Sequence, residues 1–127
     1  GVHILTAEEI INCTRFEDSI ALGNYDIDIH NPEGTGTYIY HLKAQEYFRI
    51  PYRCLVPKEI DNLLVAGRCL SATHEAHSAV RIMPICACLG EAAGIAAAEA
   101  VKSNKNVRTL NVASVQSRLM EVGAQIH

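Results

Sequence analysis

The segment from residue 62 to residue 103 holds the pattern that most restricts the fold. Residues 62–67, Asn-Leu-Leu-Val-Ala-Gly, form a short apolar run that ends in glycine, and Pro84 later opens a long apolar segment. A short continuous apolar run is typical of a strand covered on both faces. Proline suits the first turn of a helix, where no backbone hydrogen bond is lost. We therefore expect a strand over 62–66, a Gly67-Arg68 corner and a helix over 84–103.

Shorter patterns in the first half of the chain predict a helix and a hairpin. Residues 6–9, Thr-Ala-Glu-Glu, match a capping box, so a short helix is expected over 7–13. Residues 25–30 alternate between apolar and polar side chains, as in a strand with one buried face. Turn-forming residues at 31–36 lead into the β-branched and aromatic segment 37–43, which is expected to return as the second strand.

The remaining segments complete a mixed α/β fold class. Residues 46–57 have an extended character, but Pro51 lacks an amide, which interrupts the strand or places it at an edge. Asn111 can cap a last helix with an apolar stripe over 112–122, which Gly123 ends. We therefore expect a few-stranded sheet with a buried C-terminal helix pair.

Two glycines within the predicted helix indicate a close approach. Gly90 and Gly94 are four residues apart, so they share one helix face. Glycine inside a helix costs about 1 kcal/mol relative to alanine. The pair therefore predicts that another part of the protein packs against the helix backbone there.

Composition excludes several function classes. The chain has 127 residues, of which 49% are hydrophobic and 20% charged, a balance typical of one globular domain. The net charge is −3, tryptophan is absent and aromatics reach only 6%, which argues against a nucleic-acid interface. The longest apolar run, 92–101, is broken by Gly94 and Glu99, so no membrane span is expected.

Five cysteines, an odd number at irregular spacing, argue against a disulfide scaffold and favour a reducing cytoplasm. Three of them lie near two histidines, a combination that raises the possibility of a zinc site. The spacing is poor, since side chains two residues apart on a helix point in very different directions. Packing and site lining are therefore favoured over metal binding. These five residues are Cys69, His74, His77, Cys86 and Cys88.

Two further side-chain groups leave alternatives open. Asp26, Asp28 and His30 fall on one face of the predicted strand, where they could bind a cation or move protons. The same pattern is typical of a solvated strand face. Cys69 with a nearby histidine could form a nucleophile pair, but such pairs are set by the fold rather than by proximity in sequence.

The Gly67-Arg68 corner is the strongest ligand candidate. In open α/β sheets, ligands bind outside the carboxyl ends of strands, where Gly67 would lie. Arg68 can hold an anion through its planar guanidinium, and the helix that begins at Pro84 offers an anion-binding N-terminus. The alternative is an ordinary strand–helix unit whose glycines serve packing.

These residues also resemble a known family. The segment 60–101, which includes "NLLVAGRCLSATHEAHSAVRIMPICACLGEAAG", is similar to the C-terminal part of FAD-dependent oxidoreductases related to the fumarate reductase and succinate dehydrogenase flavoproteins, in a broad bacterial group. Pieces at 5–10, 16–30, 49–58 and 115–126 look like the same group. The family's GxGxxG dinucleotide-binding turn is absent from this chain.

The resemblance implies where the cofactor would lie. Gly67 and Arg68 would flank the ribityl-phosphate part of FAD, although the relatives carry a glutamate where Arg68 stands. Arg81 resembles an arginine that faces flavin and substrate, and His74, together with His30 and Arg53, would line the substrate side. The start of the last helix would approach the flavin ring through Met83, Pro84, Cys86 and Ala87.

The resemblance further implies that this chain is a C-terminal portion of a longer enzyme. Residues 1–58 would belong to a β-rich substrate region, and 59–127 would supply the last strand and helices of a Rossmann-like FAD domain. The parent would transfer hydride between a small organic substrate and FAD. Alone, the portion would be inactive, would bind FAD weakly or not at all without the N-terminal FAD-binding half, and would self-associate. The alternatives are a non-enzymatic binding or dimerisation module and, third, a metal-binding module.

Overall fold

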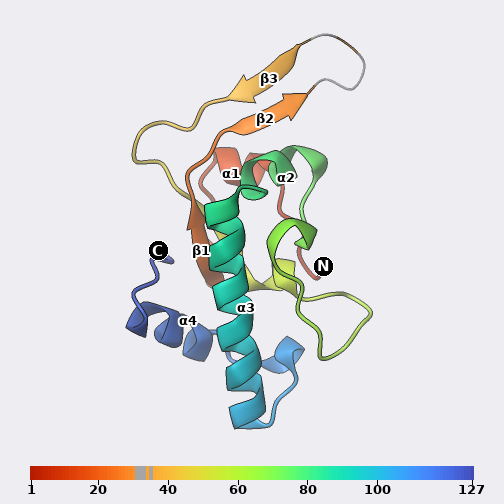
Figure 1. Cartoon of the computed structure of the whole chain (residues 1–127), viewed down its shortest axis with the longest axis vertical. Helices are drawn as coiled ribbons and strands as arrows, with labels where there is room; N and C mark the ends of the chain where they lie inside the picture. Colours follow the sequence, from red (N-terminus) through yellow and green to blue (C-terminus); the bar gives the residue numbers. More distant parts are fainter. Residues whose placement is uncertain (31–33, 35) are drawn as a thin grey trace.

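A computed structural model of the chain describes residues 1–30, 34 and 36–127 and shows a mixed α/β fold. Within the described part there are four α-helices and two separate two-stranded antiparallel sheets (Figure 1). The first sheet pairs β1 (Ser19–Gly23) with β4 (Phe48–Pro51), and the second pairs β2 (Ile27–His30) with β3 (Thr37–Tyr40). The expected mixed α/β class is confirmed.

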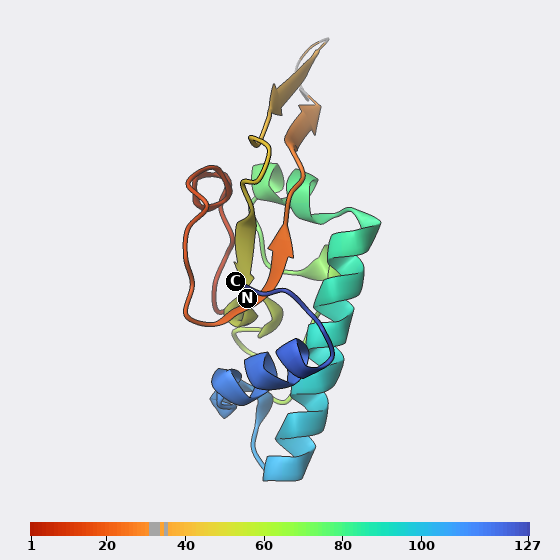
Figure 2. The same ribbon diagram turned by 90° about the vertical axis from the view of Figure 1, so that its left-hand side faces the viewer.

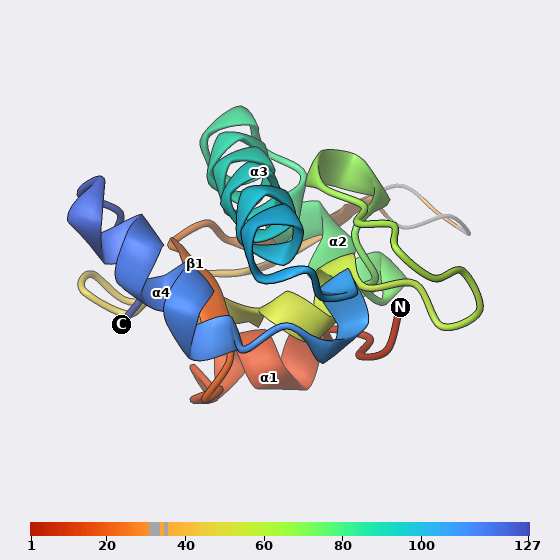
Figure 3. The ribbon, with the colours of Figure 1, turned by 90° about the horizontal axis from the view of Figure 1, so that it is seen from below.

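The β1–β4 sheet lies between two helical layers. Seen from below, α3 (Met83–Ser103) covers one face of β1 and α1 (Ala7–Ile11) lies on the opposite side (Figure 3). The register places Gly23 opposite Phe48, and a Cβ at Gly23 would lie 2.8 Å from Cδ1 of Ile85 and closer still to the Phe48 ring. Glycine is therefore required at this position because the aromatic ring and α3 fill the space beside it.

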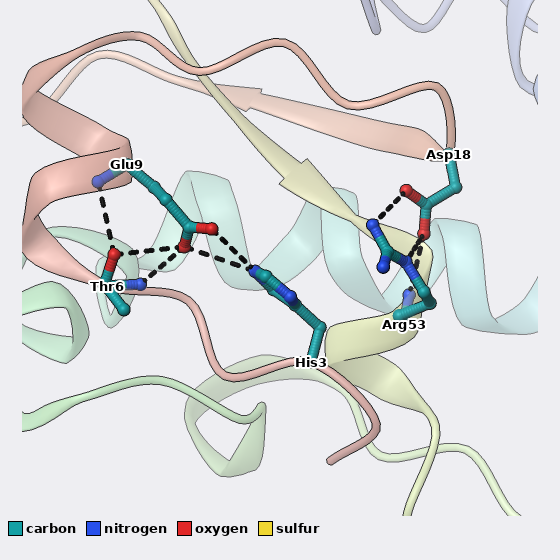
Figure 4. Close-up of polar contacts among 5 residues, drawn as sticks. All are labelled: His3, Thr6, Glu9, Asp18 and Arg53. Carbon is teal, nitrogen blue, oxygen red and sulfur yellow. Dashed lines mark hydrogen bonds and ion pairs between the residues drawn. The ribbon is translucent and has the colours of Figure 1, made fainter.

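The N-terminal helix starts as its sequence predicts. The Thr6 hydroxyl accepts a hydrogen bond from the Glu9 amide at 3.2 Å, and the Glu9 carboxylate accepts one from the Thr6 amide at 2.9 Å (Figure 4). The Nε2 atom of His3 lies 3.0 Å from a carboxylate oxygen of Glu9. The capping box is confirmed, and Leu5, which joins Ala72 in an isolated parallel bridge, connects this region to α2 (His74–Val80).

The expected hairpin is also confirmed. β2 and β3 pair from Ile27 opposite Tyr40 to His30 opposite Thr37, and the hairpin projects beyond α2 (Figure 2). Ile27 is buried against the body of the chain. Tyr25, which the alternation places on the same side as Ile27, is 42% exposed, because it precedes the strand.

The long C-terminal helix α3 packs with only one of its faces. Its buried residues are spaced three and four apart and contact β1 and α4 (Val112–Glu121), which Asn111 caps as expected. The opposite face is exposed, so the expectation of a buried helix pair is wrong for α3. The buried residues are Ile85, Leu89, Ala92, Ala96 and Ala100.

By length and composition, α3 is the one helix of the described part that could cross a membrane. This differs from the expectation that Gly94 and Glu99 would break the apolar run, because the helix as a whole extends over Met83–Ser103. Helices of folded cores can share this length and composition. The packing of α3 on β1 and α4 places it within the fold described here.

The strand expected over 62–66 does not form in the described part of the chain. The segment pairs with no strand, and its one backbone hydrogen bond to another segment runs from the Val65 amide to the Leu55 carbonyl at 2.9 Å. A central strand needs a neighbouring strand beside it, and no other described strand lies alongside this segment. The expectation was therefore wrong for this structure.

Candidate functional site

The N-terminus of α3 is open toward ligands. Its N-cap residue, Ile82, provides no side-chain hydrogen bond, and no acidic residue lies in the first turn. The first amides of a helix lack partners within it, and the helix dipole makes this end positive. Met83, the first helical residue, is 79% exposed. This end of α3 therefore offers amides and positive potential to an anionic or electron-rich group.

The Gly67-Arg68 corner lies against this helix end. Gly67–Cys69 form a short 3-10 helix, η2, and Gly67 has a left-handed φ of +74°. A Cβ at Gly67 would lie 3.9 Å from the Cβ of Cys86. Glycine is favoured here by the backbone conformation, because other residues adopt it at a cost. The corner and the first turn of α3 thus form one continuous surface.

A cleft of about 800 Å³ opens at this surface. Its walls come from the segment before β2, from η2, from the end of α2 and from the start of α3. Four residues named from the sequence, Arg68, Arg81, Met83 and Pro84, line it together. The remaining lining residues are Tyr25, His77 and Ile82.

The charged side chains at the cleft are both cationic. Arg68 and Arg81 line the cleft, both are exposed, and neither has an ion-pair partner among the described residues. Arg81 is the C-cap of α2, where its backbone amide donates to the His77 carbonyl at 3.1 Å. The Nε2 atom of His77 lies 2.8 Å from the Arg68 carbonyl oxygen. Two guanidinium groups without acidic neighbours in the lining suit an anion.

Other residues named from the sequence lie beside the cleft or apart from it. Gly67 and Cys86 adjoin it through their mutual contact, and Ala87 is exposed one residue further along α3. His74 is the exposed first residue of α2 and is not one of the lining residues. The side chain of His30 lies outside the part of the chain that the structure describes.

Arg53 serves a structural ion pair. Its Nε and Nη2 atoms donate to the two carboxylate oxygens of Asp18 at 2.9 and 3.2 Å (Figure 4). The hydrogen bond with Asp18 raises the pKa of Arg53 above its ordinary value. Arg53 lies at a separate hollow that is lined also by Tyr52 and Arg108, so the structure does not bring it to the cleft.

Three residues that line the cleft were not assigned to it from the sequence. Tyr25 was considered only as part of the alternating segment 25–30, Ile82 precedes the expected helix, and His77 was considered only with the cysteines. One signal could have placed His77: it lies four residues before Arg81, so a helix puts both on one face. No sequence pattern links Tyr25 to α3, because their proximity depends on the tertiary fold.

Among the described residues, no three His, Cys, Asp or Glu side chains gather in a way that could hold a metal ion. Cys86 is partly buried and Cys88 exposed, which agrees with their different directions on α3. Cys54 is fully buried, and this burial raises the pKa of its thiol to about 12. A thiol with such a pKa stays protonated near neutral pH and is a poor nucleophile.

The acidic residues of β2 and its approach do not form one row. Asp26 accepts hydrogen bonds from His41, at 2.7 Å, and from the Leu42 amide, and the bond from His41 lowers the pKa of Asp26. The backbone amide of Asp28 donates to the Ser78 hydroxyl of α2 at 3.1 Å. The Oδ1 atom of Asp28 is buried without a hydrogen-bond partner among the described residues. The pattern therefore separates into a surface pair and a partly buried carboxylate.

Comparison with known proteins places this architecture in a family. Residues 1–119 match the family described as FAD dependent oxidoreductase. The chain belongs to this family. A search of curated proteins and a search of solved structures each found no significant match. For a full-length protein the family implies the cofactor FAD and oxidoreductase activity.

The cleft fits one part of FAD. The uncapped end of α3, the two arginines and the side-chain-free Gly67 provide amides, positive charge and close backbone approach. These groups suit the polar edge of a flavin ring or its ribityl phosphate. The GxGxxG turn that holds a dinucleotide pyrophosphate does not occur in this sequence.

Proposed function

We propose that this chain forms the flavin side of the FAD site in a longer flavoprotein related to fumarate reductase and succinate dehydrogenase. The observation that carries the proposal is the cleft, which unites Arg68, Arg81, Met83 and Pro84 at the uncapped start of α3. Arg68 comes from η2, whereas Arg81, Met83 and Pro84 come from the end of α2 and the start of α3. FAD, the cofactor that the family implies, suits the groups that these residues present. Residues 59–127 would then complete the FAD domain, and 1–58 the substrate region.

Each residue has a distinct task in this proposal. FAD, when bound, supplies the ring that exchanges hydride with a small organic substrate. The α3 amides and Arg68 hold the electron-rich edge and phosphate side of the cofactor, where positive potential favours added negative charge. Arg81 binds an anionic group of the substrate or the flavin, and His74 is assigned to the substrate side.

A second part of the proposal concerns the half that would hold the pyrophosphate. Within the described part, the amides of Leu64 and Ala66 donate to no backbone acceptor, and Leu63 is 41% exposed. Asn62 lies in a turn with a left-handed φ of 57°, whereas residues 63–66 form no helix or turn, and another strand can add to unpaired amides such as these. We propose that a strand of the N-terminal FAD-binding half pairs with 63–66.

The neighbouring face of α3 supports the same partner. A Cβ added at Gly90 or Gly94 would meet nothing within 4 Å, and Val101 is 82% exposed. Between this face and Leu63 lies a hollow of about 780 Å³. The unpaired segment lies beside a helix face of small residues. In an α/β domain, a parallel sheet covers a surface of this kind.

Uncovered, this apolar surface favours association of the isolated chain with itself. The alternative function, a non-enzymatic dimerisation module, relies on the same surface. We also propose a reducing, cytoplasmic location, since five cysteines, an odd number at irregular spacing, do not suit a disulfide framework.

Flavin binding tests the proposal. The 127-residue chain and the product of the complete reading frame are dialysed against FAD, and bound flavin is measured by visible absorbance. We expect stoichiometric flavin on the longer protein and little on the chain. Stoichiometric flavin on the 127-residue chain would contradict the proposal that it forms only part of the FAD site. A longer protein without bound flavin would contradict the flavoprotein function. A dimerisation module would show neither flavin binding nor a longer reading frame.

A further inference from the structure

We infer that His77 is a positioning residue: it fixes the backbone of Arg68, and with it the base of the Arg68 side chain, at the cleft that Arg81 also lines. Its role in cofactor binding rests on the proposed function, whereas its role in holding η2 can be measured on this chain alone. His77 itself lines the cleft between the two arginine-bearing elements, η2 and α2.

The contact between His77 and Arg68 defines which ring nitrogen of His77 carries the hydrogen. The Nε2 atom of His77 lies 2.8 Å from the Arg68 carbonyl oxygen, and a carbonyl oxygen can only accept a hydrogen bond. Nε2 must therefore carry the hydrogen and donate it to the Arg68 carbonyl.

Few other hydrogen bonds hold the Arg68 turn. The hydrogen bonds within it are local: the Leu70 amide donates to the Gly67 carbonyl at 3.2 Å, and the Cys69 thiol donates to the Ala66 carbonyl at 3.0 Å. The preceding segment 62–66 has no strand partner among the described residues. Among the described residues, the hydrogen bond from His77 to the Arg68 carbonyl is the one that joins η2 to another element.

The helix that carries His77 is a firm support. The Thr73 hydroxyl caps α2 by accepting from the Ala76 amide at 3.3 Å, and the Thr73 amide donates to the Leu5 carbonyl at 2.8 Å. Ala76, Ala79 and Val80 are fully buried. Since Arg81 ends the same helix, one rigid element carries Arg81 and, through His77, also holds Arg68.

Paired substitutions test the inference through a donor rescue. His77→Phe keeps a planar ring but removes the donor, whereas His77→Gln places an amide nitrogen at a reach similar to that of Nε2. His127→Phe, at the exposed C-terminus, is the matched control. Two readouts are used: hydrogen exchange of the Leu70 amide in the 127-residue chain, and the dissociation constant for FAD of the product of the complete reading frame.

We expect His77→Phe to speed Leu70 exchange about five- to tenfold, the effect of losing one hydrogen bond, while the Ala76 and Leu89 amides keep their rates. His77→Gln should restore the Leu70 rate to within about twofold, and nitrogen NMR of the wild-type chain should show the imidazole hydrogen on Nε2. An unchanged Leu70 rate in His77→Phe, or no rescue by His77→Gln, would overturn the inference.

The cofactor readout separates the inference from the proposed function. If the longer protein binds FAD, His77→Phe should raise its dissociation constant about threefold or more, and His77→Gln should not. Faster exchange without weaker FAD binding would overturn the positioning role in the cofactor site. If the wild-type longer protein binds no FAD, the proposed function fails, and the exchange measurements alone decide whether His77 holds the turn.

Discussion

A Cβ placed on Gly67 would lie 3.9 Å from the Cβ of Cys86, so the turn that follows residues 62–66 packs against the first turn of α3. This contact is an ordinary van der Waals distance, which leaves room for a methyl group. The left-handed φ of +74° at Gly67 is the feature that favours glycine. The contact and the turn together set the position of the Arg68 backbone beside the open helix end.

We predict that Gly67→Ala lowers the free energy of unfolding by about 1–2 kcal/mol, because alanine resists the left-handed conformation. Urea unfolding of the 127-residue chain measures the loss. Asn104→Gly, at a left-handed helix end with φ 51°, is the reverse control and should not destabilise the chain. A Gly67→Ala chain as stable as the wild type would show that the turn relaxes without cost.

Replacing a glycine by alanine should change the free energy of unfolding in opposite directions inside the fold and on the exposed face of α3. Gly90→Ala should raise the free energy of unfolding of the chain by about 1 kcal/mol, because the new methyl group meets no atom and alanine favours the helix. Gly23→Ala should lower it by about 1–3 kcal/mol or more, since the Phe48 ring occupies that space. Equal effects of the two changes would contradict the packing described here.

In the proposed longer protein, the effect of Gly90→Ala on stability should have the opposite sign. If a sheet of the FAD-binding half covers this face, a methyl group at Gly90 or Gly94 would meet it, and Gly90→Ala should destabilise the longer protein. Thermal unfolding of both forms, with and without the substitution, measures the change of sign. A stabilisation in both forms would show that the face stays open and would contradict the proposed partner.

Alkaline pH should destabilise the chain through two buried groups. Burial raises the pKa of Cys54 from 9.0 to about 12 and that of Tyr52 from 10.0 to about 12. Because the folded state resists ionisation, this stabilisation is complete below pH 9 and is lost as the pH rises from 9 to 12. The unfolding free energy should therefore decline across this interval.

Substitutions assign this decline to its sources. Each group can contribute a slope of at most about 1.4 kcal/mol per pH unit, so Cys54→Ala and Tyr52→Phe should each flatten the profile. Tyr52→Phe should also cost about 1 kcal/mol at neutral pH, because its hydroxyl donates to the buried Val107 carbonyl at 2.8 Å. Val115→Ala, which removes no titratable group, should lower stability without changing the slope. A slope unaffected by Cys54→Ala would contradict the assignment.

Local patterns in the sequence predicted local structure well. The capping box at Thr6 and Glu9, the hairpin of β2 and β3, and the helix over Met83–Ser103 are confirmed, because each depends on contacts between residues near in sequence. The strand over 62–66 was wrong, because its pairing depends on a strand that the described chain does not offer. The prediction that α3 is buried was wrong for its exposed face, because the described chain offers no element that covers this face.

The candidate site was predictable only in part. Arg68, Arg81, Met83 and Pro84 were named from one strand–helix pattern and a family resemblance, and the structure brings them to one cleft. Tyr25 could not be placed there, since it comes from a distant segment that reaches α3 only in the folded chain. The cofactor and catalytic roles assigned to these residues and to His74 remain predictions.

The dissociation constant for FAD of the Arg68→Gln, Arg81→Gln double variant tests the central claim most directly. It is measured in the product of the complete reading frame, beside Arg118→Gln on the exposed surface of α4 as a control that removes one positive charge away from the cleft. If the cleft at the start of α3 holds the cofactor, loss of two charge-assisted contacts should weaken FAD binding at least about tenfold, while Arg118→Gln changes it little. An unchanged dissociation constant in the double variant would contradict the account.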